Sequence, residues 1–415
     1  MKKMKLATLS AALLAGALLS LPAQAQKTLS ALFMAQAAYS EDDVRAMTVD
    51  FERANAGVKV KLEFVPYDAL HDKIVAAHAA GSAGYDVVLF DVVWPAEFAS
   101  KGFLQDVSKR IAPADVAKVF PGAWTTVSYQ NKYWGMPWIL DTKFLFYNTD
   151  MLKKAGIAAP PKTWAELESQ AKLIKDKGLV KYPVVWSWAQ KEAMICDYTT
   201  LSVANGGKFF DNGKPSFQSG GSLDAVKYMK ASLDAGLTNP NSREYEEEDV
   251  RKVFSNGDAA FALNWGYMYN MAKDPKESKV VGKVGITSAP GVSGKSTASA
   301  VNGSMGLGIT AKSANPEEAW KFIQHMSSAV TQEKYAKLSL PIWKDSYTKA
   351  SVTTGQEDFV AAAAKSLQVM AARPETPVYQ ELSAILQKQL HGVLLGASAP
   401  DVGMTAASEA VAKLK

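Results

Sequence analysis

Residues 135–156, G-M-P-W-I-L-D-T-K-F-L-F-Y-N-T-D-M-L-K-K-A-G, decide how this chain is organised. The stretch begins with an aromatic, proline-marked segment and continues as an apolar run rich in residues that favour strands. It ends in a helix-like tail that is closed by glycine. Because strand and helix patterns alternate on both sides of it, we interpret this stretch as the first crossing between two lobes.

The length of the chain indicates more than one domain, and its first residues indicate an exported protein. At 415 residues the chain is too long for one ordinary core, since domains average roughly 150 residues. Residues 1–25 contain the three parts of a secretory signal: early lysines, an apolar run over residues 6–21, and an A-Q-A cleavage box. We expect cleavage before Gln26, and an uncleaved signal anchor is the alternative.

The apolar segments and the cysteine content indicate where the protein is located. No later segment is apolar over the roughly 18 residues that a membrane span needs. Cys196 is the only cysteine, so we expect no intrachain disulfide and no lipid anchor. These features predict export to a bacterial periplasm. We also expect the protein to be a monomer.

The charge and the aromatic content of the chain indicate the kind of partner. The formal charge of +5 falls to +2 when the three signal lysines are subtracted, which is too small to indicate a nucleic-acid partner. Trp and Tyr, at 10 and 15 residues, exceed what a core needs. Some of these aromatic side chains are therefore expected to face a ligand.

Strand and helix patterns alternate from the start of the mature chain. Short apolar or alternating runs predict strands at residues 28–33, 58–65 and 86–90. Between them, Ser40 followed by three acidic residues predicts the start of one helix, and residues 67–80 predict a second. This order is typical of βαβ units with a parallel sheet.

The residues that follow the predicted strands are candidates for a binding site. Ligands of such sheets bind beyond the carboxyl ends of the strands. Gln36, Tyr39, Tyr67, Asp91 and Trp94 occupy these positions. The alternative roles are structural, since Asp91 is also suited to cap the next helix and Trp94 to pack at its start.

The same alternation resumes after residue 156. A T-W-A-E box at residues 163–166 predicts a capped helix, and Ser222 is expected to cap another. The acidic run 244–249 fits the first turn of a helix better than a calcium loop, because it lacks the alternating ligands and the glycine of such loops. Further strands are predicted at residues 182–188, 258–264, 283–288 and 303–310.

The sequence contains no recognisable catalytic or metal motif. The G-K-S triplet at residues 294–296 lacks the earlier glycine of a phosphate-binding loop, because Ala289 occupies that position. The four histidines have no metal-ligand spacing, and no G-x-S-x-G elbow occurs. We therefore expect no cofactor, no metal ion and no covalent nucleophile.

Two carboxylates require a choice between catalysis and binding. Asp91 and Asp141 follow predicted strands, which suits either the acid/base pair of a glycoside hydrolase or hydrogen bonding to ligand hydroxyls. The chain lacks the regular repeats of a long barrel enzyme. Binding is therefore favoured, and an exported glycoside hydrolase remains the alternative of another class.

Several sequence blocks occur together in an order that points to one family. Residues 85–104 contain a buried strand followed by D-V-V-W-P, and residues 145–152 read L-F-Y-N-T-D-M-L. The chain then contains P-x-T-W-x-E-L, F-x-x-G-x-A-A, N-P-E-E-A-W-x-F-I and a C-terminal pair of helix patterns at residues 161–167, 254–260, 315–323 and 379–407. Together these blocks resemble the bacterial extracellular solute-binding proteins of the carbohydrate, maltose-binding-protein-like class.

The resemblance implies a fold and a function. The expected fold is α/β, of the two-lobed periplasmic binding protein type II, with a mainly parallel sheet and flanking helices in each lobe. Residues 26–140 with about 290–343 would form one lobe, and about 141–289 with 344–415 the other. The implied function is capture of a sugar by hinge closure and its delivery to the inner-membrane permease subunits of an ABC importer. A polyol or a glycerol phosphate is the alternative ligand.

Position within these blocks extends the candidate site. Asp141 corresponds to a sugar-contacting acid of the family's maltose-binding member, and Tyr267 to a tryptophan that stacks on the sugar. Arg373 lies in a segment that often faces the cleft, where its guanidinium would donate to hydroxyls. Of Trp186 and Trp188, at most one is expected to face the cleft. The predicted site is completed by Trp265, Gly303, Ser304 and Trp343, the last with a hinge-packing role as its alternative.

Overall fold

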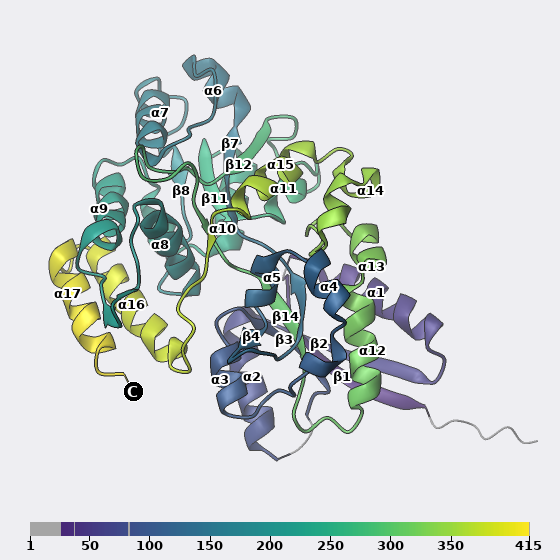
Figure 1. Cartoon of the computed structure of the whole chain (residues 1–415). Helices are drawn as coiled ribbons and strands as arrows, with labels where there is room; N and C mark the ends of the chain where they lie inside the picture. Colours follow the sequence, from purple (N-terminus) through teal and green to yellow (C-terminus); the bar gives the residue numbers. More distant parts are fainter. Residues whose placement is uncertain (1–25, 37, 82–83, 415) are drawn as a thin grey trace, which may run out of the picture.

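The computed structural model describes residues 26–36, 38–81 and 84–414, and the predicted secretory signal lies outside them. The chain forms two lobes, each built around its own sheet (Figure 1). Separate clusters of buried apolar side chains fill the two lobes. The two-lobed α/β architecture expected from the sequence is confirmed. Within the described residues, no helix combines the length and the apolar character needed to span a membrane.

The first lobe contains a five-stranded sheet with the order β2-β1-β3-β14-β6. β1, β2 and β3 are parallel, and β14 joins the sheet antiparallel to β3 and β6. β3 is buried along its whole length, as its continuous apolar run predicts. The strands are β1 (Lys27–Met34), β2 (Val58–Val65), β3 (Val87–Asp91), β6 (Met136–Ile139) and β14 (Met305–Ile309).

Helices from two distant parts of the chain cover this sheet. α1 starts with the predicted cap, in which Ser40 and Asp43 form a capping box. α12 comes from the later part of the chain, packs against α1, β6 and β14, and appears green among the purple and blue elements of Figure 1. The helices are α1 (Glu41–Ala54), α2 (Tyr67–Ala79), α3 (Pro95–Ser100), α4 (Pro113–Lys118), α5 (Pro121–Thr125), α12 (Pro316–Ser327) and α13 (Ala329–Lys334). A hairpin of β4 (Ser128–Tyr129) and β5 (Lys132–Tyr133) lies between α5 and β6 in the chain.

The second lobe contains a four-stranded sheet with the order β12-β7-β11-β8. β7 is antiparallel to β12 and β11, whereas β11 is parallel to β8. A parallel pair needs a long crossover, and the helices between β8 and β11 supply one, while β7 enters from the other lobe in the opposite direction. β7 thus runs opposite to the other three strands of this sheet, as β14 does in the first sheet. Its strands are β7 (Lys143–Asn148), β8 (Val184–Val185), β11 (Phe261–Trp265) and β12 (Val284–Ser288).

Both faces of the second sheet are covered. Leu145 packs with the apolar cluster that contains α8, α9, α16 and α17, whereas Phe144 and Phe146 pack on the opposite face with α10 and α15. The helices are α6 (Thr149–Ala155), α7 (Trp164–Asp176), α8 (Glu192–Ala204), α9 (Gly220–Asp234), α10 (Glu247–Asn256), α11 (Met268–Met271), α14 (Ala350–Thr353), α15 (Glu357–Ser366), α16 (Tyr379–Leu394) and α17 (Pro400–Val411). Two short ribbons pair β9 (Phe210–Asp211) with β10 (Lys214–Pro215) and β13 (Ala300–Val301) with β15 (Met370–Ala371).

Two local expectations in the second lobe were wrong. The strand predicted at residues 182–188 is reduced to β8, because the backbone N–H of Trp186 donates to the Ser242 hydroxyl and that of Trp188 to the Ser242 carbonyl. A side-chain contact and a turn thus replace a strand partner. α9 starts after Ser219, and Ser222 lies inside the helix, where it is buried and donates to the Lys208 carbonyl.

The crossing predicted at residues 135–156 connects the two sheets. β6 belongs to the first sheet and β7 to the second, and residues 140–142 join them. The chain returns to the first lobe between β12 and β14. The chain crosses a third time between α13 and α14. The first two crossings are hydrogen-bonded, because the Gly303 amide donates to the Asp141 carbonyl at 3.1 Å and the Asp141 amide to Ser304 Oγ at 3.3 Å.

β7 begins with a lysine that is completely buried. Lys143 Nζ lies 2.7 Å from the Asp197 carboxylate and donates to Ser187 Oγ at 2.7 Å and to the Ala193 carbonyl at 3.3 Å. Burial opposes the charged form, but the carboxylates of Asp197 and Glu247 outweigh it and raise the pKa of Lys143. The ion pair of Lys143 with Asp197 therefore holds the start of β7 against α8, and the N–H groups of Lys143 Nζ have acceptors.

Substitution Lys143→Met is expected to lower the free energy of unfolding by about 3 kcal/mol or more, because it leaves the Asp197 carboxylate buried without its cation. The comparison is Lys172→Met, which removes an exposed ion pair with Asp176 and should cost less than about 1 kcal/mol. Urea unfolding of the mature protein measures both. Equal midpoints for the two variants would contradict this account of the crossing.

Candidate functional site

The candidate site lies where the strands of the first sheet end and face the second lobe. β1, β2 and β3 are parallel, so their carboxyl ends meet at one edge. Asp91 ends β3, Tyr67 opens the helix after β2, and Gln36 and Tyr39 follow β1. The structure therefore brings four of the predicted residues to one edge of the sheet, the position at which α/β proteins bind ligands.

A buried ion bridge connects this edge with the second lobe. Arg373 Nη2 donates to Asp91 Oδ1 at 3.1 Å and to the Asn302 carbonyl at 3.3 Å, and Nη1 donates to the Glu192 carboxylate. Asp91 comes from the first sheet and Glu192 from the first turn of α8. One guanidinium is thus shared by two carboxylates from different lobes, and the three groups carry a net negative charge.

Two tyrosines border the ion bridge. The Tyr379 hydroxyl donates to Glu192 from the start of α16. Burial and the nearby carboxylates of Asp91 and Glu192 raise the pKa of Tyr67 well above its usual value. Burial also raises the pKa of Asp91, against the opposing charge of Arg373. Both tyrosines therefore stay neutral and are able to donate a hydrogen bond in this cluster.

Trp94 lies in an aromatic group beside the ion bridge. Its ring is 5.5 Å from Tyr67, 5.2 Å from His71 and 5.6 Å from Phe98, between ring centroids. Trp94 occupies the N-cap position of α3 but makes no side-chain cap hydrogen bond. It is buried, and its indole N–H has no partner among the described residues. The ring thus fills a structural role and also retains an unused donor.

A second aromatic pair lies at the end of β1. The rings of Tyr39 and Trp138 are 5.0 Å apart, and both side chains are buried. Within the described part of the chain, the Tyr39 hydroxyl and the Trp138 indole N–H have no hydrogen-bond partner. Gln36 adopts a left-handed backbone conformation with φ of 54°, and its buried amide nitrogen is also unpaired there. Polar atoms therefore collect beside apolar rings at this end of the site.

Asp141 lies at the junction of the two crossings. Its carboxylate accepts from the Thr142 amide at 2.8 Å and from the Gly266 amide at 3.3 Å. Burial raises the pKa of Asp141 to about 7, against these two backbone donors. The side chain predicted to contact ligand hydroxyls thus also fixes the backbone that follows β11.

Trp265 packs directly on the second crossing. A Cβ atom at Gly303 would lie 2.2 Å from the Trp265 ring, so only glycine fits there. The Trp265 indole donates to Glu247 at 3.0 Å, and its ring lies 5.2 Å from Lys143 Nζ. Trp265, Gly303 and the neighbouring Ser304, whose hydroxyl accepts from Asp141, therefore form one contact at the junction.

Trp186 and Trp188 lie in the core of the second lobe. Their rings stack with centroids 5.0 Å apart, and both side chains are buried. Residues two positions apart in an extended segment point to the same side, so the two rings lie together in this core. That at most one of them faces the cleft stays a prediction. Trp186 donates to Thr238 Oγ1, whereas the Trp188 indole has no partner in the described residues.

Tyr267 and Trp343 are both held by contacts within a lobe. The Tyr267 hydroxyl donates to Glu248 at 3.3 Å, and the residue follows the end of β11 instead of lying in the strand. The Trp343 indole donates to the Ser327 carbonyl at 2.8 Å in the first lobe. Neither contact reaches the Arg373 bridge.

Sequence reasoning missed Glu192, Tyr379 and Asn302. Glu192 follows the aromatic run at residues 182–188, so the alternation of strand and helix was the available signal. Its partners Arg373 and Ser383 lie 181 and 191 residues away in the chain. No local pattern predicts contacts of that range.

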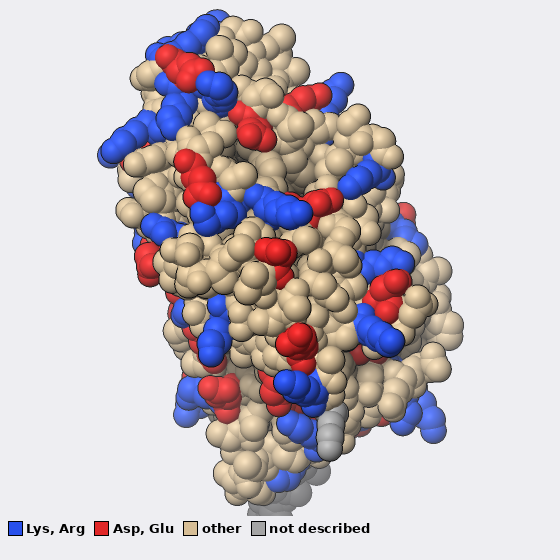
Figure 2. All heavy atoms as spheres, turned by 90° about the vertical axis from the view of Figure 1, so that its left-hand side faces the viewer, with Lys and Arg blue, Asp and Glu red and all other residues tan. Residues whose placement is uncertain are grey.

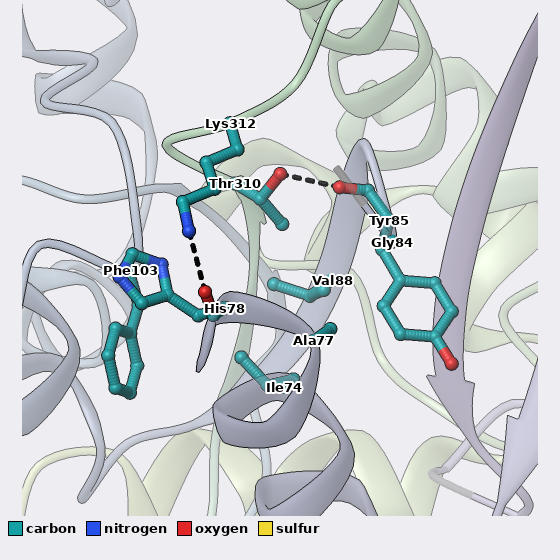
Figure 3. A pocket seen from close by; sticks show the side chains of 9 residues that line it. All are labelled: Ile74, Ala77, His78, Gly84, Tyr85, Val88, Phe103, Thr310 and Lys312. Carbon is teal, nitrogen blue, oxygen red and sulfur yellow. Dashed lines mark hydrogen bonds between the residues drawn. The ribbon is translucent and has the colours of Figure 1, made fainter. Parts of the chain in front are cut away.

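One small cavity at the surface of the first lobe lies away from this site. It measures about 20 Å³, roughly the space of one water molecule. Figure 3 shows its lining, in which Lys312 donates to the His78 carbonyl and Thr310 to the Tyr85 carbonyl. It lies at the opposite end of β3 from Asp91 and is too small for a solute.

Figure 2 shows Lys and Arg mixed with Asp and Glu over one face of the molecule, without a field of a single sign. No group of three or more His, Cys, Asp or Glu in the described residues is placed to hold a metal ion. The site is thus a polar and aromatic region between two lobes.

Comparison with known proteins identifies relatives of matching length. Residues 23–333 match the model of the family described as "Bacterial extracellular solute-binding protein". A probable ABC transporter-binding protein of Deinococcus radiodurans is 29% identical over 380 residues, which cover 86% of this chain and 87% of the relative.

Two solved structures are similar over nearly the whole chain. The maltose-bound protein MalE3 of T. maritima is 27% identical, with a TM-score of 0.86, and the match covers 93% of this chain and 100% of that one. A solute-binding protein of Agrobacterium radiobacter in complex with ribitol is 26% identical, with a TM-score of 0.84, over 94% and 100% of the two chains.

Substitution Asp141→Asn is expected to remove a pH dependence of stability. The folded protein retains a proton on Asp141 that the unfolded chain releases between about pH 4 and pH 7, so this carboxyl lowers stability as the pH rises through that window. Urea midpoints of both proteins should therefore agree at pH 4, while at pH 8 the variant should be more stable by about 2 to 4 kcal/mol. A difference that does not change with pH would contradict this account.

Proposed function

Because the chain belongs to the family of bacterial extracellular solute-binding proteins, we propose that it captures a sugar between its two lobes and delivers it to an ABC importer. The sugar would bind at the carboxyl edge of the first sheet, between Asp91, Trp94 and the crossing at Asp141. The relatives described above were solved with maltose and with ribitol. Both ligands are neutral and rich in hydroxyl groups, and a polyol is accordingly the nearest alternative to a sugar.

A set of unpaired polar atoms carries this proposal. A buried donor without an acceptor costs free energy, and native proteins leave few of them. Hydroxyl groups accept and donate, so a sugar is suited to pair with these atoms while its C–H face covers the aromatic rings. Eight of the buried side-chain atoms without a partner among the described residues, including Trp164 Nε1 and Trp188 Nε1, lie elsewhere in the molecule. The six that belong to the proposed site and its neighbours are Gln36 Nε2, Tyr39 OH, Trp94 Nε1, Trp138 Nε1, Thr142 Oγ1 and Arg373 Nε.

The charge of the site favours a neutral ligand over a glycerol phosphate. Arg373 is already paired with Asp91 and Glu192. The two carboxylates leave a net negative charge at the bridge, and a phosphate would be repelled by it. This balance supports a sugar or a polyol.

The proposed mechanism is hinge closure. The moving bodies are residues 26–140 with about 290–343, and about 141–289 with 344–415. Closure would bury the ligand between them and form the surface that the permease recognises. The Asp141 junction, where the first two crossings are hydrogen-bonded, is the position about which such a motion would turn.

The contacts of the two carboxylates support binding without catalysis. Asp91 is paired with Arg373 and accepts from the Val93 amide, and Asp141 accepts from two backbone amides. An acid/base pair needs carboxyl groups that are free to reach the bond to be broken. The exported glycoside hydrolase is therefore the weaker alternative.

A thermal-shift screen of the mature protein tests the ligand class. A neutral sugar or polyol at 100 times its Kd should add about 2.7 kcal/mol to the stability of the folded state. Maltose, tagatose, ribitol and mannitol form the first panel, and glycerol 3-phosphate and amino acids form the charged comparison. At least one neutral compound is expected to raise the midpoint and none of the charged ones.

Two outcomes would contradict the proposal. A midpoint raised only by a charged metabolite would exclude a sugar or polyol as the solute. New products after incubation with maltotriose would establish turnover and favour the hydrolase.

We further propose that the protein acts in the periplasm as a monomer, without a lipid anchor, and docks on the inner-membrane permease subunits. Expression of the full-length chain in a Gram-negative host should give a periplasmic protein that starts at Gln26. Intact-mass measurement detects this start and the absence of an added lipid. A product that keeps residues 1–25, or one found only with membranes, would contradict export by a cleaved signal.

A further inference from the structure

α8 begins with a residue that is poorly suited to its position. Lys191 is the N-cap and makes no side-chain cap hydrogen bond. Ser, Thr, Asp and Asn are the favoured N-caps, and the positive end of the helix dipole repels a cation. A residue that is unfavourable for the helix start in this way is often retained because its side chain makes a contact elsewhere in the structure.

The ammonium group of Lys191 contacts two carboxylates. It lies 3.2 Å from Glu246 and forms a closer ion pair with Asp68. These contacts raise the pKa of Lys191, chiefly through the hydrogen bond to Asp68. The side chains of Lys191 and Asp68 are 39% and 58% exposed, so the pair lies at the surface and is open to salt.

The two acids differ in the lobe to which they belong. Glu246 precedes α10 in the second lobe, as does Lys191 itself, whereas Asp68 lies in the first turn of α2 in the first lobe (Figure 1). Opening of the lobes would therefore break the contact with Asp68 and keep the contact with Glu246. The Asp68 contact stabilises only the closed form.

The ion pair lies directly beside the proposed binding site. Tyr67 precedes Asp68, and Glu192 follows Lys191, so each partner adjoins a residue of the Arg373 bridge. Neither Lys191 nor Asp68 belongs to that bridge. The pair of Lys191 and Asp68 thus lies at the rim of the proposed binding site, where it can affect closure of the lobes without contacting the solute.

We propose that Lys191 and Asp68 form a cross-cleft ion pair that favours the closed form and thereby slows release of the solute. The inference rests on the hinge closure proposed above. Because the pair contributes free energy to the closed form alone, it shifts the balance between open and closed forms and leaves the stability of each lobe unchanged. Lys191 and Asp68 are positioning residues in this mechanism.

The test measures the distance between the lobes without added solute. Spin labels at Gln130→Cys and Lys388→Cys report on the hairpin of the first lobe and on α16 of the second, and the native Cys196 is buried. Double electron–electron resonance of the mature protein then gives the populations of short and long distances. The variants are Lys191→Met, Asp68→Asn and the double substitution.

At 50 mM NaCl, each single substitution should raise the ratio of open to closed molecules about two- to five-fold, the size expected for an exposed ion pair. The double substitution should add little beyond either one, because both remove the same contact. At 500 mM NaCl the difference from the unsubstituted protein should largely disappear, since salt screens exposed charges. Lys191→Arg should retain the low-salt distribution, and so should Lys172→Met, which removes an ion pair within α7.

Three results would overturn the inference. They are distance distributions unchanged by either substitution at low salt, effects of the two substitutions that simply add, and effects that persist at high salt. If a sugar shortens the distance while the substitutions do nothing, the ion pair fails and the proposed function stands. If the substitutions shift the distance and no sugar or polyol binds, the ion pair stands and the ligand assignment fails.

Discussion

The hydrogen bonds around Asp141 are the constraint on which the arrangement of the two lobes depends. Its backbone amide and carbonyl bind Ser304 and Gly303 of the returning crossing, and its carboxylate binds the Gly266 amide after β11. One residue therefore connects the first two of the three crossings with the central part of the second sheet. Trp265 reinforces the junction, because its ring occupies the space that a side chain at position 303 would need. A buried backbone polar group needs a partner, and here the partners come from the other crossing.

The second feature that joins the lobes is the pairing of charges. Arg373 is buried between Asp91 and Glu192, and a guanidinium in that position requires both fixed geometry and full compensation. Beside it, Lys191 and Asp68 form an exposed pair at the rim. The inner bridge is expected to define the site and the outer pair to modulate its closure, because exposed pairs contribute little free energy and respond to salt.

Local patterns predicted the elements that position the site, and they failed where a single contact overrode them. The alternation at residues 58–65 gave a strand with those bounds, and Asp91 lies at a strand end as expected. The run at residues 182–188 failed as a strand because Ser242 supplies the hydrogen-bond partners of Trp186 and Trp188. Ser222 failed as a helix cap because α9 already starts after Ser219 and the Ser222 hydroxyl donates to the Lys208 carbonyl. Propensity is a weak prior in such places, since tertiary contacts outweigh it.

The sequence by itself determined the alternation of strand and helix, the crossing at residues 135–156, and the edge at which Tyr67 and Asp91 lie. These features follow from the periods of apolar residues and from caps, which are local properties of the chain. Only the tertiary structure decided that Arg373 lies between Asp91 and Glu192, which are 282 and 181 residues away. Ion pairs and burial depend on which surfaces meet after the lobes have formed. No local sequence pattern predicts which residues of the two lobes come into contact.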